Sequence, residues 1–262
     1  MASVKRPPDH LARMGLDVWV PRVSPPFGPS LLQGDPTDGV YQISLPDDRQ
    51  IAPDGVTCSG RDMPASAGEN AMPVDEAALM NWPDLEQAVA ACNRCPLHET
   101  RTQTVFGVGD RSARWMIVGE APGEQEDLQG EPFVGRAGLL LNEMIQAVGF
   151  SRQAVYIANV LKCRPPRNRD PSPDEAMACE SYLKAQLALV KPVIILAVGR
   201  VAAQNLLKTT TPIGKLRGEI HHYQNIPLVV TYHPAYLLRS QTEKRRAWDD
   251  LKLARRVYRE HS

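Results

Sequence analysis

The amino-acid sequence predicts an α/β protein: a three-layer α/β/α domain around a central, mainly parallel four-stranded sheet, preceded by a disordered N-terminal extension. In residues 84–262, short apolar runs alternate with helical stretches, which is typical of a parallel sheet covered by helices on both faces. In residues 1–83, which hold 12 of the 23 prolines, no helical or strand periodicity is sustained. We therefore expect a mostly disordered extension over 1–83 and one domain over 84–262.

Each predicted element follows from a local pattern. The predicted strands are the apolar runs at 115–119, 155–159, 193–198 and 228–232. The predicted helices cover 137–148, 173–190, 200–207 and 241–260. Gly149 is a typical stop for the first helix, and Ser172 followed by Pro173 is a typical start for the second.

Charge and hydropathy exclude some classes of protein. The chain has 30 basic and 30 acidic residues, but residues 1–83 carry 6 against 11, whereas residues 84–262 carry 24 against 19. A mildly basic domain permits nucleic-acid binding without establishing it. No apolar run approaches the roughly 20 residues of a membrane-spanning helix. The first 20 residues lack the apolar core of a secretory signal, so we expect a cytoplasmic protein with no membrane contact.

Four of the five cysteines are candidates for a metal site. Cys92 and Cys95 form a C-x2-C pair, and Cys163 and Cys179 follow the second predicted strand. A C-x2-C pair and a second pair of cysteines can together supply four thiolates to zinc or to an iron–sulfur cluster. The spacing does not separate these two alternatives. Four unrelated buried thiols are the alternative without a metal. Cys58 lies in the proline-rich extension and is expected to take no part.

Polar residues follow three of the predicted strands. A loop rich in glycine and carboxylates covers 119–138, Asn159 ends the second strand, and His233 precedes Pro234 after the fourth. Ligands of parallel sheets bind at the carboxyl ends of the strands. The loop is neither a P-loop nor a G-x-G-x-x-G motif. Its Phe133 fits either a core position or a stacking platform, and its acidic residues (Glu120, Glu124, Glu126 and Asp127) are typical of a solvated face.

These motifs together resemble those of one family. The loop at 119–138, the C-x2-C pair, the run Asn-Val-Leu-Lys-Cys-Arg-Pro-Pro-Arg-Asn-Arg at 159–169 and the run His-Pro-Ala-Tyr-Leu-Leu-Arg at 233–239 occur in the order found in family 4 uracil-DNA glycosylases, the iron–sulfur branch of that superfamily. The resemblance covers about residues 84–262. It implies a monofunctional DNA-repair enzyme that flips deoxyuridine out of DNA, hydrolyses its N-glycosidic bond and leaves an abasic site.

The resemblance also implies a set of site residues. A [4Fe–4S] cluster would be held by Cys92, Cys95, Cys163 and Cys179. The catalytic residues would be His233, Asn159 and Glu120, and the uracil-binding residues Gly119, Glu126, Phe133, Asn159 and His233. Phe133 would stack on uracil, Asn159 would read its edge and His233 would donate to O2. Glu126 would block the methyl group of thymine.

Some roles stay open at this stage. In the best-known branch of the superfamily an Asp orients the water, and Ala121 stands at that place here, so Glu120 is the nearest candidate for the general base. Each role has a structural alternative: a packing aromatic at Phe133, a strand-end cap at Asn159, a solvated carboxylate at Glu126 and a plain turn at His233. The chain also lacks the features of relatives that trap DNA covalently, so we expect ordinary turnover. No motif lysine stands out as a lyase nucleophile.

The predicted partner is uracil-containing DNA, bound by a monomer. The predicted DNA contacts are Arg164, Arg167, Arg169, Arg239 and Leu237, the last as an apolar wedge into the space left by the flipped nucleotide. The alternative for Leu237 is a helical residue that faces the core. A non-catalytic iron–sulfur DNA-binding or replication-associated module is the competing function.

The extension contains one candidate binding motif, at residues 9–22. Asp9 can cap a short helix that presents Leu11, Met14 and Trp19 as apolar anchors. The run weakly resembles the N-terminal peptide of the psi subunit of bacterial DNA polymerase III, which implies contact with a replication clamp loader. The alternative is a segment that packs on its own domain.

Overall fold

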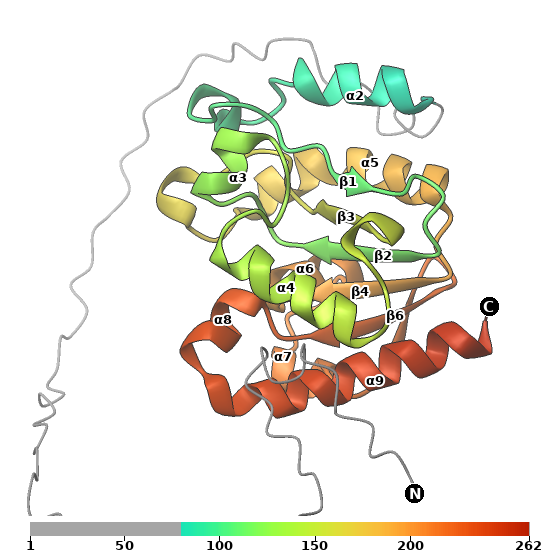
Figure 1. Cartoon of the computed structure of the whole chain (residues 1–262). Helices are drawn as coiled ribbons and strands as arrows, with labels where there is room; N and C mark the ends of the chain where they lie inside the picture. Colours follow the sequence, from blue (N-terminus) through green and yellow to red (C-terminus); the bar gives the residue numbers. More distant parts are fainter. Residues whose placement is uncertain (1–79, 262) are drawn as a thin grey trace, which may run out of the picture. The chain divides into compact units, whose positions relative to one another are not determined.

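The computed structural model describes residues 80–261, in which a six-stranded mixed sheet lies between two layers of helices (Figure 1). The strand order is β1-β3-β2-β4-β6-β5. The bounds of the strands are β1 Val108–Gly109, β2 Trp115–Gly119, β3 Tyr156–Asn159, β4 Ile194–Val198, β5 Ile220–Tyr223 and β6 Ile226–Thr231.

The four predicted strands form the parallel centre of this sheet, which confirms the predicted fold class. β2 pairs in parallel with β3 and β4, and β4 pairs in parallel with β6. The predicted number of strands was wrong, because β1 and β5 add an antiparallel strand at each edge. β1 has only two residues and β5 reads Ile-His-His-Tyr, so neither forms an apolar run that a sequence pattern would reveal.

Helices cover both faces of the sheet. Their bounds are α2 Trp82–Ala90, α3 Glu124–Gln129, α4 Arg136–Ala147, α5 Pro173–Val190, α6 Arg200–Leu207, α7 Ile213–Leu216, α8 Pro234–Arg239 and α9 Lys244–Glu260. Shorter 3-10 turns lie at Pro96–Glu99, Arg152–Ala154, Pro166–Asn168 and Gln241–Glu243. The helices predicted at 137–148, 173–190, 200–207 and 241–260 correspond to α4, α5, α6 and α9. The short α3, α7 and α8 and the initial α2 were not predicted.

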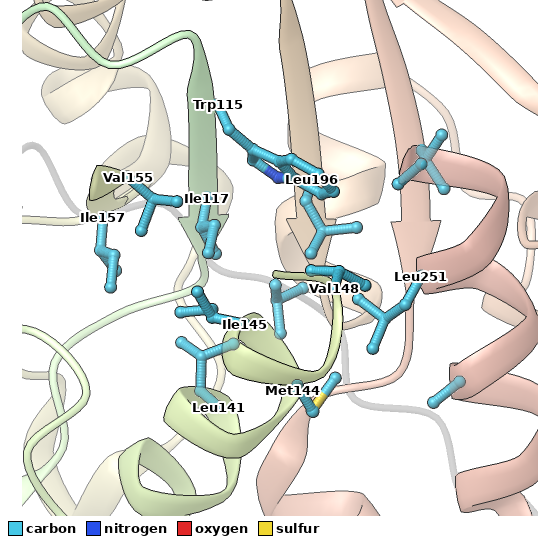
Figure 2. Packing of buried hydrophobic residues seen from close by; sticks show 14 of the residues in the cluster. Trp115, Ile117, Leu141, Met144, Ile145, Val148, Val155, Ile157, Leu196 and Leu251 are labelled. Atoms are coloured by element: carbon cyan, nitrogen blue, oxygen red, sulfur yellow. The ribbon is translucent and has the colours of Figure 1, made fainter. Parts of the chain in front are cut away.

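The alternation of side chains along the strands builds two cores. On one face, Trp115, Ile117 and Leu196 pack against α4 and α9 (Figure 2). On the other face, Met116 and Val118 pack against α5 and α6. Since successive residues of a strand point to opposite faces, strands that are apolar throughout are buried on both sides and identify the centre of the sheet.

The boundaries of α5 show how local chemistry defines an element. The Ser172 hydroxyl accepts a hydrogen bond from the backbone N–H of Glu175 at 3.2 Å, and the Glu175 carboxylate accepts one from the N–H of Ser172 at 2.8 Å. This reciprocal pair is a capping box. The helix ends at Val190, where Lys191 adopts a left-handed backbone conformation with a φ of +51°.

The described chain begins with α2, two residues before the predicted domain boundary at 84. Asn81 caps this helix by accepting a hydrogen bond from the N–H of Asp84 at 3.1 Å. Trp82 packs on Tyr156, with 5.5 Å between ring centroids. The predicted boundary therefore falls inside a helix that packs on the domain. The rest of the predicted extension, including the 9–22 motif and Cys58, lies outside the described residues, so its disorder stays a prediction.

None of the helices within residues 80–261 combines the length and the apolar character needed to cross a lipid bilayer.

Candidate active site

A cleft of about 760 Å³ opens at the carboxyl edge of the parallel strands. Its wall includes Asn159, the last residue of β3, and residues that directly follow β2, β4 and β6. Several predicted site residues line it together: Glu120, Glu126, Phe133, Asn159, Arg169, His233 and Arg239. This convergence is what the parallel topology requires, because the carboxyl ends of parallel strands share one edge.

Asn159 lies at the base of this cleft. It is the last residue of β3, directly opposite Gly119 at the end of β2, and it is only 2% exposed. Its Oδ1 is buried and has no hydrogen-bond partner. A buried acceptor without a partner costs free energy, on the order of 1–3 kcal/mol, so its presence at the base of a cleft points to a ligand that donates to it.

The backbone around Asn159 is held in register beyond the strands. The N–H of Val160 donates to the carbonyl of Gly119 at 2.9 Å, and that of Leu161 donates to the carbonyl of Glu120 at 3.0 Å. A Cβ on Gly119 would lie 2.4 Å from Asn159 Oδ1 and 2.6 Å from Phe133 Cζ. Gly119 is therefore needed so that the amide and the ring can approach each other.

Phe133 sits in the cleft in a strained backbone conformation. Its φ is +55°, a value that non-glycine residues rarely adopt. The neighbouring backbone holds it there: Glu126 Oε1 accepts hydrogen bonds from the N–H groups of Val134 at 2.9 Å and Gly135 at 3.0 Å. Arg152 also donates to the carbonyl of Pro132 at 2.6 Å. Strain of this kind is typical of functional sites, where the surrounding structure fixes a side chain for a ligand.

Two carboxylates of the loop bind backbone N–H groups instead of forming a solvated face, contrary to the expectation for its acidic residues. Glu126 binds the backbone beside Phe133. Asp127 is 2% exposed and accepts hydrogen bonds from the N–H of Thr102 at 2.9 and 3.1 Å. The short helix α3 brings both side chains inward. Its sequence has no apolar periodicity from which the helix could have been predicted.

His233 is a neutral hydrogen-bond donor to the cleft. It is the N-cap of α8, where its Nδ1 accepts a hydrogen bond from the N–H of Ala235 at 3.1 Å. In a neutral imidazole the other nitrogen, Nε2, then carries the proton. Burial lowers the pKa of His233 to about 4, although Glu126 opposes the shift. Its ring lies 5.6 Å from that of Phe133, centroid to centroid.

Glu120 is a carboxyl with an unusual affinity for its proton. Burial, aided by the charge of Asp170, raises the pKa of Glu120 to about 7, while Arg200 opposes the shift. Arg200 and Asp170 form an ion pair, and both line the cleft. The sequence did not reveal this pair, because its members lie 30 residues apart in a loop and at the start of α6.

The predicted DNA contacts divide into different groups. Arg239 is exposed at the cleft wall. Arg169 lies there too, but it is paired with Glu175 through bonds of 2.8 and 2.6 Å. Arg164 and Arg167 are not part of the wall.

For Leu237 the structure corrects the prediction. This side chain is 1% exposed and belongs to the core beneath α4 and α9, so it is not available as a wedge. The first turn of α8 directs it inward and leaves Tyr236 exposed at the cleft instead.

The four candidate cysteines line a second, small cavity, whose wall also includes Lys162. Cys92 and Cys95 follow α2, Cys163 follows β3, and Cys179 lies in α5. A guanidinium N–H of Arg101 donates to Cys163 Sγ at 3.1 Å, and the backbone N–H of Lys162 donates to Cys179 Sγ at 3.3 Å. Within residues 80–261, no group of three or more His, Cys, Asp or Glu side chains is placed to hold a single metal ion.

Comparison with known proteins identifies the family. The sequence profile described as the uracil DNA glycosylase superfamily matches residues 106–252. A type-4 uracil-DNA glycosylase of Archaeoglobus fulgidus is 45% identical over 163 residues, which cover 59% of this chain and 82% of the relative.

Two further relatives agree with this match. A type-4 uracil-DNA glycosylase of Thermotoga maritima is 43% identical over 62% of this chain and 85% of its own length. A type-5 uracil-DNA glycosylase of Pyrobaculum aerophilum is 33% identical over 60% of this chain and 83% of its own length. The predicted membership is confirmed: the chain belongs to the uracil DNA glycosylase superfamily and, within it, to the type-4 branch.

Proposed function

We propose that this chain excises uracil from DNA by hydrolysing the N-glycosidic bond of deoxyuridine. The observation that carries the proposal is the unpartnered Oδ1 of the buried Asn159, at the base of a cleft that also holds the rings of Phe133 and His233. Uracil is flat enough to stack on Phe133 and has the polar edge that Asn159 requires. The nucleotide reaches the cleft by flipping out of the stack.

The amide of Asn159 distinguishes uracil from cytosine. Its Oδ1 accepts the N3–H of uracil, and its NH2 group donates to O4. Cytosine reverses this pattern, with an acceptor at N3 and an amino donor at C4. A buried site whose polar groups are left unpaired by the wrong ligand discriminates strongly against that ligand.

Glu126 shapes the wall that excludes thymine. Its carboxylate is fixed by the N–H groups of Val134 and Gly135, so it cannot swing away to admit a methyl group. A charged oxygen beside a methyl group would also lose hydration without gaining a partner. The same hydrogen bonds hold the Phe133 loop, so Glu126 acts both on selectivity and on stacking.

His233 stabilises the leaving group. As the glycosidic bond breaks, negative charge develops on uracil, and the Nε2–H of the neutral imidazole donates to O2. Because the ring orientation is already fixed by the bond from Ala235, no reorganisation is required when the charge appears. A donor aimed at developing charge is typically worth about 2.7–4 kcal/mol.

Glu120 is proposed to accept a proton from the attacking water. Its pKa of about 7 means that a substantial fraction is ionised at neutral pH, and the ionised carboxylate orients water and takes its proton. No lysine is among the described residues that line the cleft, so hydrolysis without lyase chemistry is the proposed outcome.

The four cysteines are proposed to hold a [4Fe–4S] cluster. Zinc needs four sulfurs about 2.3 Å from one ion, whereas the thiols here surround a cavity without converging on one point. A four-iron cluster takes one thiolate per iron and so fits such a ring. The N–H donors from Arg101 and Lys162 suit thiolate ligands. When bound, the cluster supplies a structural link between α2, α5 and the segment 159–163.

DNA contacts are proposed for basic residues near the cleft that are wholly or partly exposed. Arg164, Arg167 and Arg239 can reach phosphates without entering the pocket, and Arg169 shares its charge with Glu175. Tyr236 replaces Leu237 as the exposed side chain next to the flipped nucleotide. Phosphate contacts supply affinity, while the cleft supplies selectivity.

The N-terminal motif at 9–22 is proposed to contact a replication clamp loader. Trp19 would be its main anchor. The enzyme is further proposed to act as a monomer near DNA in the cytoplasm.

The decisive experiment measures release of free uracil from a labelled oligonucleotide with a single deoxyuridine. Matched oligonucleotides with thymidine or deoxycytidine at that position should release nothing. Asn159→Ala should slow release at least about a hundredfold and leave binding to unmodified DNA nearly unchanged. Binding without any release of uracil would instead favour the non-catalytic module.

A further inference from the structure

Lys162 is a fully buried cation between the two cavities. It is three residues after Asn159 and directly before Cys163, and it is only 1% exposed. Its Nζ donates to the main-chain carbonyl of Asn159 at 2.8 Å and to Gln186 Oε1 at 2.6 Å. Lysine is almost never fully buried unless it is paired, so its partners explain why it is here.

The backbone of Lys162 is fixed as firmly as its side chain. Its N–H donates to Cys179 Sγ at 3.3 Å, and its carbonyl accepts a hydrogen bond from the N–H of Val105 at 2.8 Å. Gln186 is fixed in turn, since its amide donates to the carbonyl of Phe106 at 2.9 Å and to the hydroxyl of Tyr156 at 3.1 Å. The ammonium therefore lies in a rigid setting.

No carboxylate of the described residues forms an ion pair with Lys162. The nearest sulfurs are those of Cys163, which directly follows Lys162, and of Cys179, which accepts its backbone N–H. A buried charge without an opposite charge is costly. Asn159 and Gln186 supply only neutral acceptors, so a balancing negative charge would come from the cysteines once they are thiolate ligands.

We propose that Lys162 is a positioning residue that couples the cysteine cavity to uracil recognition, by holding the backbone of Asn159 from the side of the sulfurs. This inference rests on the proposed function. The carbonyl that Lys162 binds belongs to the same residue whose amide lacks a partner in the cleft. When the ammonium is removed, the end of β3 loses one of the contacts that hold it, and the position of the Asn159 amide at the base of the cleft is less tightly fixed.

The test replaces the lysine with an uncharged side chain of similar length, Lys162→Met. Lys184→Met is the matched control, because Lys184 lies on α5 at the surface and pairs only with Glu180. Three quantities are compared: iron per chain, kcat and KM per iron-loaded enzyme, and binding to oligonucleotides carrying 2′-fluoro-deoxyuridine or 2′-fluoro-deoxycytidine. These analogues resist cleavage, so the binding ratio reports recognition without turnover.

We expect Lys162→Met to lower kcat per iron-loaded enzyme at least about tenfold and to raise KM for the deoxyuridine substrate, since a misplacement of about 1 Å can cost about a hundredfold. Its preference for the uracil analogue should fall by a similar factor, while affinity for unmodified DNA stays the same. Lys184→Met should match the wild type. A purely structural lysine would lower iron content or Tm but leave kcat and preference per loaded enzyme unchanged, which would overturn the proposal.

A second variant covers the case in which Lys162→Met does not fold. Gln186→Met removes the other acceptor of the ammonium without touching a cysteine, and it should retain iron and lose several-fold in preference. Wild-type preference in this variant would overturn the coupling. If the wild-type protein neither prefers the uracil analogue nor releases uracil, the proposed function itself fails, and the two failures are thus distinguishable.

Discussion

The cleft and the cysteine cavity are both lined by residues of the segment 159–163, yet the polar groups of the two differ in how they are paired. In the cleft, Asn159 Oδ1 is buried without a partner and Phe133 is held at a positive φ. In the cavity, the sulfurs of Cys163 and Cys179 already receive N–H donors. The cleft leaves a buried acceptor open to a ligand, whereas in the cavity two sulfurs already have donors from the protein itself.

This difference separates two kinds of energetic cost. The unpartnered amide and the strained backbone in the cleft destabilise the folded protein, and substrate binding recovers that cost. Burial raises the pKa of Cys179 to about 12, so its thiol stays protonated until a metal takes the proton's place. Cysteine variants should therefore act first on folding and metal content, whereas variants of the cleft side chains that face the ligand should act mainly on turnover.

The largest expected effect is on the cavity. Cys179→Ala should abolish bound iron and bring uracil release below detection, because the cluster loses a ligand that links α5 to the segment 159–163. The anaerobically purified wild-type protein should be brown, with about four irons and four sulfides per chain, as one thiolate per iron requires. Iron and sulfide analysis and visible absorption check both statements. Cys58→Ser is the control and should keep its colour. A colourless, active protein that contains one zinc would contradict the assignment.

The next effect separates the cleft from the cavity. His233→Ala should lower kcat for uracil release by about 10²–10³-fold, the cost of losing one donor to a developing anion. Iron content and Tm should stay close to those of the wild type. His222→Ala, which removes an exposed histidine on β5, should change nothing. Single-turnover kinetics on a deoxyuridine oligonucleotide provide the measurement, and near-wild-type release by the His233 variant would refute the role.

The pH dependence of kcat sharpens the comparison within the cleft. Glu120 must be ionised to take a proton, and its pKa is raised to about 7, so kcat should rise about tenfold from pH 6 to pH 8 and then level off. His233, with a pKa of about 4, stays neutral throughout this range, so it adds no second slope to the pH profile of kcat. Glu120→Gln should flatten the profile. A rise that persists in this variant would assign the titration to another group.

The smallest expected effect tests the support beneath His233. A Cβ on Gly199 would lie 3.1 Å from His233 Cβ, and the φ of +99° at Gly199 strains any L side chain. Gly199→Ala should lower kcat several-fold and reduce the free energy of unfolding by about 1–3 kcal/mol. Gly214→Ala meets nothing within 4 Å and is the matched control. Equal kcat in both variants would show that His233 does not depend on this contact.

The parallel centre of the fold was predictable because its signals are local. The apolar runs at β2, β3, β4 and β6 are buried on both faces, and burial on both faces requires continuous apolar sequence. The capping box of α5 can likewise be recognised from the spacing of Ser172 and Glu175. The edge strands β1 and β5 were missed because one is too short and the other too polar. The helices α3 and α8 were missed because six residues do not reveal a period.

The candidate site could be predicted only in part from the sequence. The family resemblance named Asn159, Phe133 and His233, and the structure brings all three into one cleft. The resemblance favoured Leu237 as a wedge, and only the structure decided for the alternative, a helical residue that faces the core, because the packing of α8 sets which of its apolar residues turns inward. The resemblance also could not predict the pair of Asp170 and Arg200, whose members meet only in the folded chain.

The sequence alone therefore determined the order of the elements, the burial of the central strands and the identity of the residues at their carboxyl ends, because these depend on residue type and local spacing. Only the tertiary structure decided the states of those residues. Burial sets the pKa values of Glu120 and His233, the close approach at Gly119 places Asn159 against Phe133, and the fold encloses Lys162 between the cysteines and the cleft. Desolvation and contact arise from segments distant in sequence, and no local pattern records them.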